Sequence, residues 1–186
     1  MTLTERLSHP ATEPWTLDDL GQLPEDGQRY EIFEGSLLVS PHADVWHGRI
    51  ANQLRRLLDR QAPDDLFVGQ DVGVANHRRT SYFVPDLFVC HRTALERRAP
   101  ALDPSDVLLV AEVLSPTNAG RDLVLKRHSY AAAGIGRYWL VDPQGGTLTV
   151  LALDEHGYHE EITVTRSSRW STDSPFPLTL DLADVL

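Results

Sequence analysis

Glu112 is the most unusual residue of this sequence, because it interrupts the apolar segment 107–114. Alternate residues of a strand share a face, so Glu112 lies on the same face as Leu108, Val110 and Leu114. A carboxylate that is buried without a partner is costly, and we therefore expect Glu112 to be paired, protonated or bound to a metal ion. For this residue alone, a salt bridge to a nearby arginine is an equally good explanation.

A second acid, Asp86, follows Pro85 at the start of a predicted strand. Taken alone, Asp86 is typical of an aspartate that caps a turn at a strand entrance. If its strand neighbours the strand of Glu112, however, the two carboxylates repel each other unless a cation lies between them. Oxygen ligands with one open side suit Mg²⁺, which keeps several waters and binds phosphate oxygens. The two acids together predict a Mg²⁺ site that Mn²⁺ could also fill.

Lys126 is the only lysine of the chain, and the other strongly basic residues are all arginines. It is four residues from Asp122 and four from Tyr130, so the three share one face of a predicted helix. If this face packs on the sheet, Lys126 is directed toward the carboxylates, where a lysine can exchange a proton or act as a compact charge beside water. An ordinary surface pair between Asp122 and Lys126 explains the same spacing.

The remaining candidates are weaker. Glu31 lies on a predicted hairpin, where it could bind a metal or orient a water molecule, although a solvent-facing acid is equally consistent. The histidines form no pair at metal-ligand spacing. His47 could face the cleft, but we interpret it as a polar residue on the surface of a helix. Cys90 is the only cysteine, which excludes an internal disulfide and a thiolate metal cluster.

The elements that must position these residues follow from periodicity and from chain breaks. We predict, in order, a short helix that starts near Thr16, two strands within 29–40 that turn at 34–35, a helix over 44–61 and strands over 66–75, 85–90 and 106–114. A helix over 119–133, strands over 137–142, 147–153 and 158–165, and a short helix over 181–186 follow. This order predicts an α/β (α+β) fold in which a mixed central β-sheet is flanked by helices. The helix over 119–133 is a crossover that makes its two flanking strands parallel and adjacent.

Length and composition indicate one globular domain. The chain has 186 residues, of which 41% are hydrophobic and 24% charged, and we expect a loose tail over 1–14 before a single domain over 15–186. The longest apolar run is too short to cross a membrane, and no signal peptide is evident, so we expect a cytoplasmic protein. The net charge of −10 disfavours a protein that coats DNA non-specifically, but leaves a local basic patch possible.

The motifs resemble the Uma-type endonuclease family, which belongs to the PD-(D/E)XK restriction-endonuclease-like superfamily. The resemblance runs from about Thr16 to the C-terminus. It rests on the order and spacing of short pieces: Tyr30-Glu31, Glu34-Gly35, Ser40-Pro41, Val84-Pro85-Asp86, Glu112-Val-Leu-Ser-Pro116, Asp122 with Lys126 and Tyr130, and Gly136-Arg-Tyr-Trp-Leu-Val-Asp-Pro143. One departure is that Leu114 stands where the superfamily has a lysine two residues after the acid. The resemblance implies that Lys126, on the following helix, replaces it.

This resemblance implies a restriction-endonuclease-like core with late β-hairpins and a Mg²⁺-dependent hydrolysis of phosphodiester bonds in DNA. It implies that Asp86, Glu112 and the carbonyl group of Val113 hold the metal ion. Lys126 would position the attacking water or stabilise negative charge, and Glu31 would bind a second metal or fix the lysine.

The resemblance further implies that Asp122 and Tyr130 contact the catalytic side chains and hold them in position.

Other functions remain open at this point. A nuclease-like fold that serves as an interaction or regulatory module without turnover fits the acidic charge, and a hydrolase of another phosphate ester is a third interpretation. Because an acidic monomer has little surface to hold DNA, we also expect a homodimer that pools its arginines.

Overall fold

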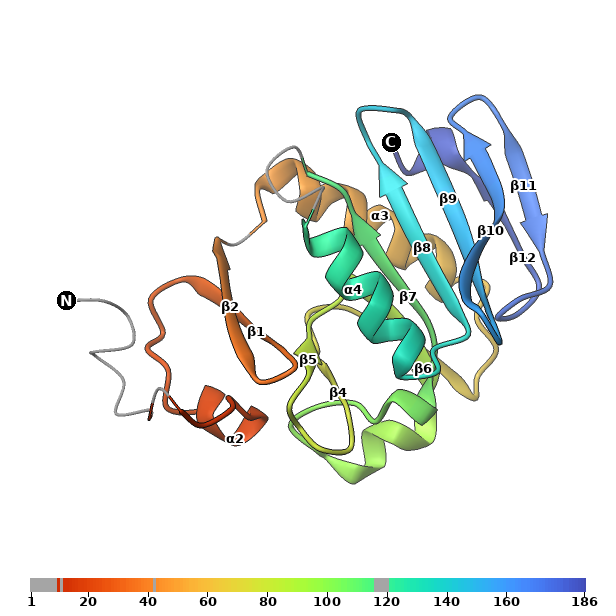
Figure 1. Ribbon diagram of the computed structural model, residues 1–186. Helices are drawn as coiled ribbons and strands as arrows, with labels where there is room; N and C mark the ends of the chain where they lie inside the picture. The colour runs from red at the N-terminus through yellow and green to blue at the C-terminus, as the bar shows by residue number, and fades with distance from the viewer. Residues whose placement is uncertain (1–9, 11, 42, 116–120) are drawn as a thin grey trace.

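The structure is a computed structural model that describes residue 10 and residues 12–41, 43–115 and 121–186. Its strands form two β-sheets and a separate two-stranded ribbon (Figure 1). The helices are α2 (Leu17–Leu20), α3 (Val45–Asp59) and α4 (Arg121–Ala132), with 3₁₀ turns at Arg92–Arg97, Pro104–Asp106 and Leu182–Asp184. No helix in these ranges is long and apolar enough to span a lipid bilayer.

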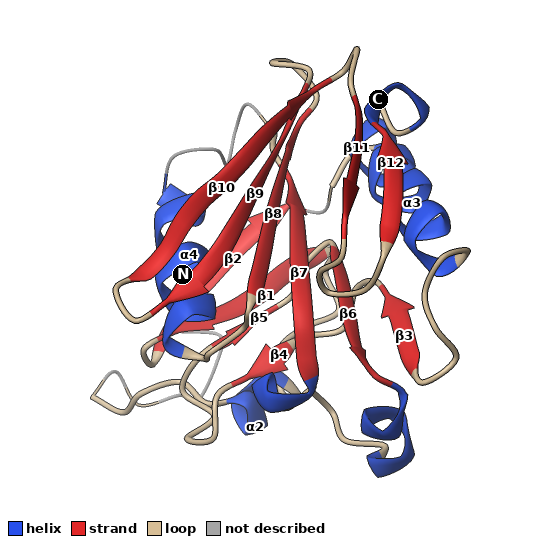
Figure 2. Ribbon diagram, turned by 90° about the vertical axis from the view of Figure 1, so that its right-hand side faces the viewer, coloured by secondary structure: helices blue, strands red, loops and turns tan. Residues whose placement is uncertain are grey.

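Six strands form the larger sheet in the order β10-β9-β8-β7-β6-β3, and they run side by side in Figure 2. Their bounds are β3 (Leu66–Gly69), β6 (Leu87–His91), β7 (Val107–Val113), β8 (Arg137–Asp142), β9 (Thr147–Asp154) and β10 (Gly157–Thr165). The pair β7–β8 is parallel and the other pairs are antiparallel. The predicted mixed sheet, and the predicted crossover that makes these two strands parallel neighbours, are therefore confirmed.

The two faces of β7 pack against different layers. Leu109, Ala111 and Val113 belong to one apolar cluster, which also contains the buried face of α3 and the C-terminal segment. Val110 belongs to a second cluster with Tyr130 of α4 and with residues of the smaller sheet. Because side chains alternate along a strand, Glu112 faces this second layer. The fold thus directs one acid of the central strand toward α4.

Helix α3 covers the first face of the sheet. It buries Ile50, Leu54 and Leu58, which confirms the predicted amphipathic helix. Trp46 shares the apolar spacing on which this prediction rests, but it is 55% exposed and does not belong to the buried face.

Asp44 caps the N-terminus of α3 by accepting a hydrogen bond from the backbone N–H of His47. This cap fixes the first turn of α3, and with it the place from which the His47 side chain projects.

The smaller sheet has the order β2-β1-β5-β4 and carries Glu31. Its strands are β1 (Gln28–Phe33), β2 (Ser36–Pro41), β4 (Val74–Ala75) and β5 (Tyr82–Phe83). The hairpin β1–β2 turns at Glu34 and Gly35, as predicted, and both have positive φ angles (45° and 79°). A Cβ atom on Gly35 would also lie 2.6 Å from the Pro14 side chain, so glycine is required there.

The single strand predicted over 66–75 is wrong, because β3 and β4 belong to different sheets. The chain leaves the larger sheet after Gly69, where a Cβ atom would overlap the ring of Phe88, and turns at Asp71, whose φ is 55°. The strand predicted from residue 85 begins instead at Leu87. Asp86 therefore stands just before β6, in the connection from the smaller sheet to the larger one.

Two strands near the C-terminus were not predicted. They are β11 (Arg169–Thr172) and β12 (Leu178–Asp181), which pair with each other. The ring of Trp170 lies 5.6 Å from that of Trp139 on β8, so packing on the larger sheet holds this ribbon. The short helix predicted over 181–186 is a 3₁₀ turn. The predicted tail over 1–14 and the predicted helix start at 119–120 lie mostly or wholly outside the described residues.

Candidate active site

Four charged side chains are buried in the described part of the chain, and they are the four predicted as catalytic. Glu31, Asp86, Glu112 and Lys126 have exposed fractions of 4%, 6%, 7% and 7%, and no other polar or charged residue of the described ranges is buried to this degree. Charged groups are rarely buried unless they are paired. Their common burial suggests that one site gathers all four.

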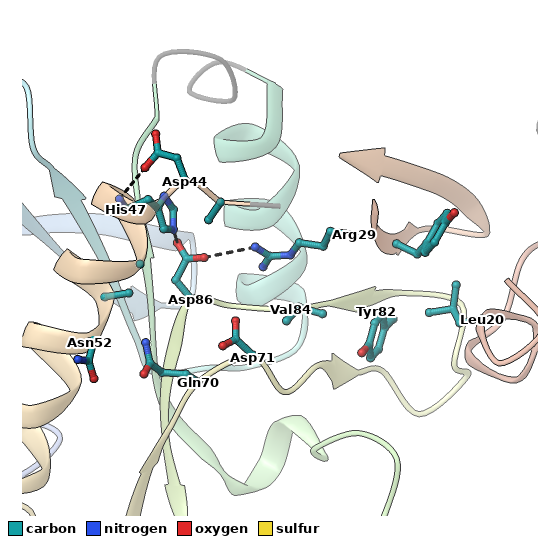
Figure 3. Close-up of a pocket in the computed structure, with 14 residues that line it drawn as sticks. Leu20, Arg29, Asp44, His47, Asn52, Gln70, Asp71, Tyr82, Val84 and Asp86 are labelled. Atoms are coloured by element: carbon teal, nitrogen blue, oxygen red, sulfur yellow. Dashed lines mark hydrogen bonds and ion pairs between the residues drawn. The ribbon is translucent and has the colours of Figure 1, made fainter. Parts of the chain in front are cut away.

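Asp86 reaches across to the strand of Glu112. Its Oδ2 accepts a hydrogen bond of 2.8 Å from the backbone N–H of Val113, the residue after Glu112. Asp86 also meets the ring of His47 and the guanidinium group of Arg29 (Figure 3). The Nε2 atom of His47 lies 2.9 Å from Oδ2, and a guanidinium nitrogen of Arg29 donates to Oδ1 over 3.3 Å.

These partners decide the ionisation state of Asp86. Burial alone would raise its pKa, but the contact with His47, followed by the charges of Lys126 and Arg29, lowers the pKa to about 2. His47 shows the reciprocal effect. Burial disfavours its protonated ring, but the contact with Asp86 outweighs burial and raises the pKa of His47. Asp86 is therefore a carboxylate anion held among cations.

Glu112 is held by α4. The Lys126 Nζ lies 3.0 Å from each carboxylate oxygen of Glu112, and the hydroxyl group of Tyr130 donates to Oε1 over 2.9 Å. Lys126 and Tyr130 are one helical turn apart, so the predicted common face of this helix does point at the sheet. The side chain of Asp122, the third residue of that predicted face, lies outside the described residues.

Burial dominates the electrostatics at Glu112. It raises the pKa of Glu112 to about 7, against the opposing charge of Lys126 and with the aid of the nearby Asp86 charge. Lys126 is also desolvated, which disfavours its charge, but Glu112 and Glu31 outweigh this and raise its pKa. Contacts with Glu112 and Glu31 thus keep the ammonium group charged although only 7% of Lys126 is exposed.

Glu31 connects the smaller sheet to this centre. Its Oε1 accepts a hydrogen bond of 2.9 Å from the backbone N–H of Val84 and lies 3.4 Å from the Lys126 Nζ. The Arg29 guanidinium is 3.6 Å from the same oxygen. Glu31 therefore contacts both cations, Lys126 at the Glu112 side and Arg29 at the Asp86 side.

A pocket of about 670 Å³ opens beside Asp86. The first turns of α3, the strand β1 and the segment that follows β3 surround it, and Figure 3 shows its lining. The lining includes Asp86, Arg29, His47, Asn52, Gln70 and Asp71. Glu112 and Lys126 do not line it. A ligand in this pocket would meet Asp86 and its cationic partners first.

The donor set fits a hard divalent cation. Within the described ranges, no three His, Cys, Asp or Glu side chains form a ready-made metal cage. Mg²⁺ does not need one, because it binds through one or two carboxylates and keeps several waters. The Val113 N–H bond brings the Asp86 carboxylate to the backbone next to Glu112. The long contact between Asp86 Oδ1 and Arg29, at the edge of the pocket, is the one that a metal ion could most easily replace.

Sequence reasoning missed two members of this site, Arg29 and His47. His47 was interpreted as a surface residue, and this is wrong, because its ring contacts Asp86. Arg29 did carry a signal, since it is two residues before Glu31 and thus on the same face of a strand. Nothing in the local pattern of α3 distinguishes His47, which meets Asp86 only through the packing of this helix on the sheet.

Comparison with known proteins identifies the family. No curated protein matches the chain. Among solved structures, it is similar to the crystal structure of a "putative nuclease belonging to DUF820" from Anabaena variabilis ATCC 29413, with a TM-score of 0.73 and 20% identity over 92% of this chain and 97% of the other. This likeness shows a shared fold, in which a mixed central sheet is flanked by helices as predicted. Residues 17–183 match the Uma2 family, described as "Putative restriction endonuclease". The chain therefore belongs to the Uma2 family, and this membership supports a nuclease role.

Proposed function

We propose that this protein is a metal-dependent endonuclease that hydrolyses phosphodiester bonds of DNA. The observation that carries the proposal is the burial of Glu31, Asp86, Glu112 and Lys126 around one centre next to a pocket. A set of desolvated charges is costly to fold, and such sets are characteristic of functional sites. The family membership is consistent with this chemistry.

Each residue has a role in the proposed mechanism. Asp86, Glu112 and the carbonyl group of Val113 would hold Mg²⁺ or, in its place, Mn²⁺. When bound, the metal lowers the pKa of a coordinated water and neutralises charge that develops on the phosphate. Lys126 orients this water or stabilises the developing charge, from a position already fixed by Glu112.

The remaining groups position these side chains. Glu31 holds the Lys126 ammonium from the side of the smaller sheet, and the hydroxyl group of Tyr130 orients Glu112. Arg29 is always charged and lines the pocket beside Asp86. A guanidinium at this place is suited to bind a phosphate oxygen of the substrate.

The test is cleavage of single-stranded, duplex and branched DNA with Mn²⁺. We expect the wild-type protein to cleave at least one form and Lys126→Met to lose about 10²- to 10³-fold in rate. Arg127→Met is the matched control, since it removes the neighbouring exposed cation of α4 and is expected to retain activity. An unchanged rate in Lys126→Met would remove this lysine from the mechanism.

A second function has one specific observation in its favour. Arg29, His47 and Lys126 already compensate the carboxylates without a metal ion, which also suits a nuclease-like fold that acts as an interaction module without turnover. Calorimetry distinguishes the two. Binding of Mn²⁺ to the wild-type protein supports the enzyme, whereas a titration without heat of binding supports the silent module. Sedimentation velocity on the same samples tests the proposed homodimer.

A further inference from the structure

We propose that the exposed face of α3 is the surface that binds the sugar-phosphate backbone of DNA beside the scissile bond. This surface, called here the α3 ridge, consists of Trp46, Arg49, Asn52, Arg56 and Arg60. The inference deepens the proposed function and rests on it, because it names the part of the molecule that would hold the substrate.

Charge is the first observation. Residues 45–60 contain four arginines and one aspartate, a net charge of +3 in a chain whose total is −10. The aspartate, Asp59, lies 3.9 Å from Arg55 and so is already paired. Among the described residues, no acid forms an ion pair with Arg49, Arg56 or Arg60, and all three are exposed. A polyanion is the partner that such a stripe attracts.

The position of the stripe is the second observation. Asn52 lines the pocket next to Asp86, and its side chain is also exposed (Figure 3). Arg49 is three residues before it and Arg56 four residues after it, so both are its neighbours on the helix surface. The two arginines are about 10 Å apart along the helix, which allows them to contact separate phosphates.

Trp46 supplies the third observation. It stands at the start of α3 with 55% of its surface exposed, and neighbouring Val45 is 92% exposed. The Arg49 guanidinium lies 4.8 Å from the centre of its ring. An exposed aromatic ring beside an arginine is a platform on which a base or a sugar can stack. The α3 ridge thus combines arginines, which can bind the phosphates of a nucleic acid, with an aromatic ring, on which its bases or sugars can stack.

DNA binding at several salt concentrations tests the ridge. Fluorescence anisotropy of a labelled 20-base-pair duplex in EDTA reports binding without cleavage. We expect the double variant Arg49→Gln/Arg56→Gln to bind at least about tenfold more weakly at low salt. We also expect the slope of log affinity against log salt to fall by about 2, because each lost phosphate contact removes about 0.9. Arg166→Gln, an exposed arginine in the turn after β10, is the matched control.

Three outcomes would overturn the proposal. One is a double variant with the same affinity and salt slope as the wild-type protein, and another is a wild-type protein that binds no DNA at low salt. The third is a dimer in sedimentation velocity that the double substitution converts to a monomer, because the ridge would then join two copies of the chain. Failure of the catalytic proposal is seen separately, as a wild-type protein that hydrolyses neither DNA nor the small diester bis(p-nitrophenyl) phosphate.

Discussion

Asp86 and Glu112 are the two acids of one site, but their surroundings differ. Asp86 borders the pocket among Arg29, His47 and a backbone N–H group, whereas Glu112 is enclosed between β7 and α4. Both are almost fully buried. Even so, the pKa of Asp86 is lowered to about 2 and that of Glu112 is raised to about 7.

This difference teaches that burial does not set the charge of a carboxylate by itself. At Asp86 several hydrogen-bond donors and cations outweigh the cost of desolvation, while at Glu112 the same cost exceeds the attraction of Lys126 and is increased by the neighbouring Asp86 charge. Asp86, which borders the pocket, is thus ionised, whereas Glu112, which is enclosed, holds the Lys126 ammonium group in position.

The largest effect is expected in catalysis. Asp86→Asn and Glu112→Gln each keep the size of the side chain but remove a negative charge that the proposed metal needs. We expect either change to lower Mn²⁺-supported DNA cleavage by about 10³-fold or more, measured under single-turnover conditions. Circular dichroism serves as the control for folding. A folded variant that cleaves at the wild-type rate would exclude its acid from the metal site.

The pH dependence of stability distinguishes the two acids, because their contributions change with pH in opposite directions. The folded-state pKa of Asp86 lies below its ordinary value of 3.8, so its stabilising contribution is present above pH 3.8 and is lost as the pH falls through about 2. For Glu112 the folded-state pKa lies above 4.5, so its contribution is present below pH 4.5 and is lost as the pH rises through about 7.

Urea unfolding in EDTA from pH 2 to 8 measures both effects. We expect Asp86→Asn to reduce the loss of unfolding free energy at acid pH by about 2 to 3 kcal/mol. We expect Glu112→Gln to reduce the loss of unfolding free energy between pH 4.5 and 7 by about the same amount. If the wild-type protein and Glu112→Gln lose stability in parallel over pH 4.5 to 7, the enclosed acid is not the group that titrates there.

A smaller effect is expected at Arg29, which would compete with the proposed metal ion for Asp86. Arg29→Gln removes the guanidinium 3.3 Å from Asp86 Oδ1. We expect Mn²⁺ to bind this variant about tenfold more tightly in calorimetry, equivalent to about 1.4 kcal/mol. Arg55→Gln is the control, because Arg55 pairs with Asp59 along α3. Equal or weaker metal binding in Arg29→Gln would show that this arginine does not occupy the position of the metal.

The smallest effect concerns two tyrosines of the enclosed side. The hydroxyl group of Tyr130 donates to Glu112, whereas the buried hydroxyl group of Tyr138 has no hydrogen-bond partner among the described residues. We expect Tyr130→Phe to lower the free energy of unfolding by about 1 to 2 kcal/mol and Tyr138→Phe to leave it unchanged or raise it. Urea unfolding at pH 7 measures both. Equal losses in the two variants would mean that ring packing, and not the bond to Glu112, is responsible.

Much of the framework was predictable, because some elements carry their own pattern. The helix α3 shows its buried face in the spacing of Ile50 and Leu54, and β7 is apolar on both faces because layers cover it on both sides. The sequence pattern did not distinguish β3 from β4, which were predicted as a single strand. Apolar residues stand on both sides of Gln70 and Asp71, and this short polar interruption does not show that the two strands belong to different sheets; the packing of Gly69 against Phe88 ends the first strand. The ribbon β11–β12 depends on contact with Trp139 in the same way.

The amino-acid sequence by itself determined which groups are proposed to carry the chemistry. A glutamate inside an apolar strand and a single lysine among arginines are visible without coordinates, since each contradicts the composition around it. Only the tertiary structure decided what surrounds them. Arg29 and His47 come from a strand and a helix that meet Asp86 through long-range packing, and the balance of desolvation against charge that separates the two acids exists only once those elements are assembled.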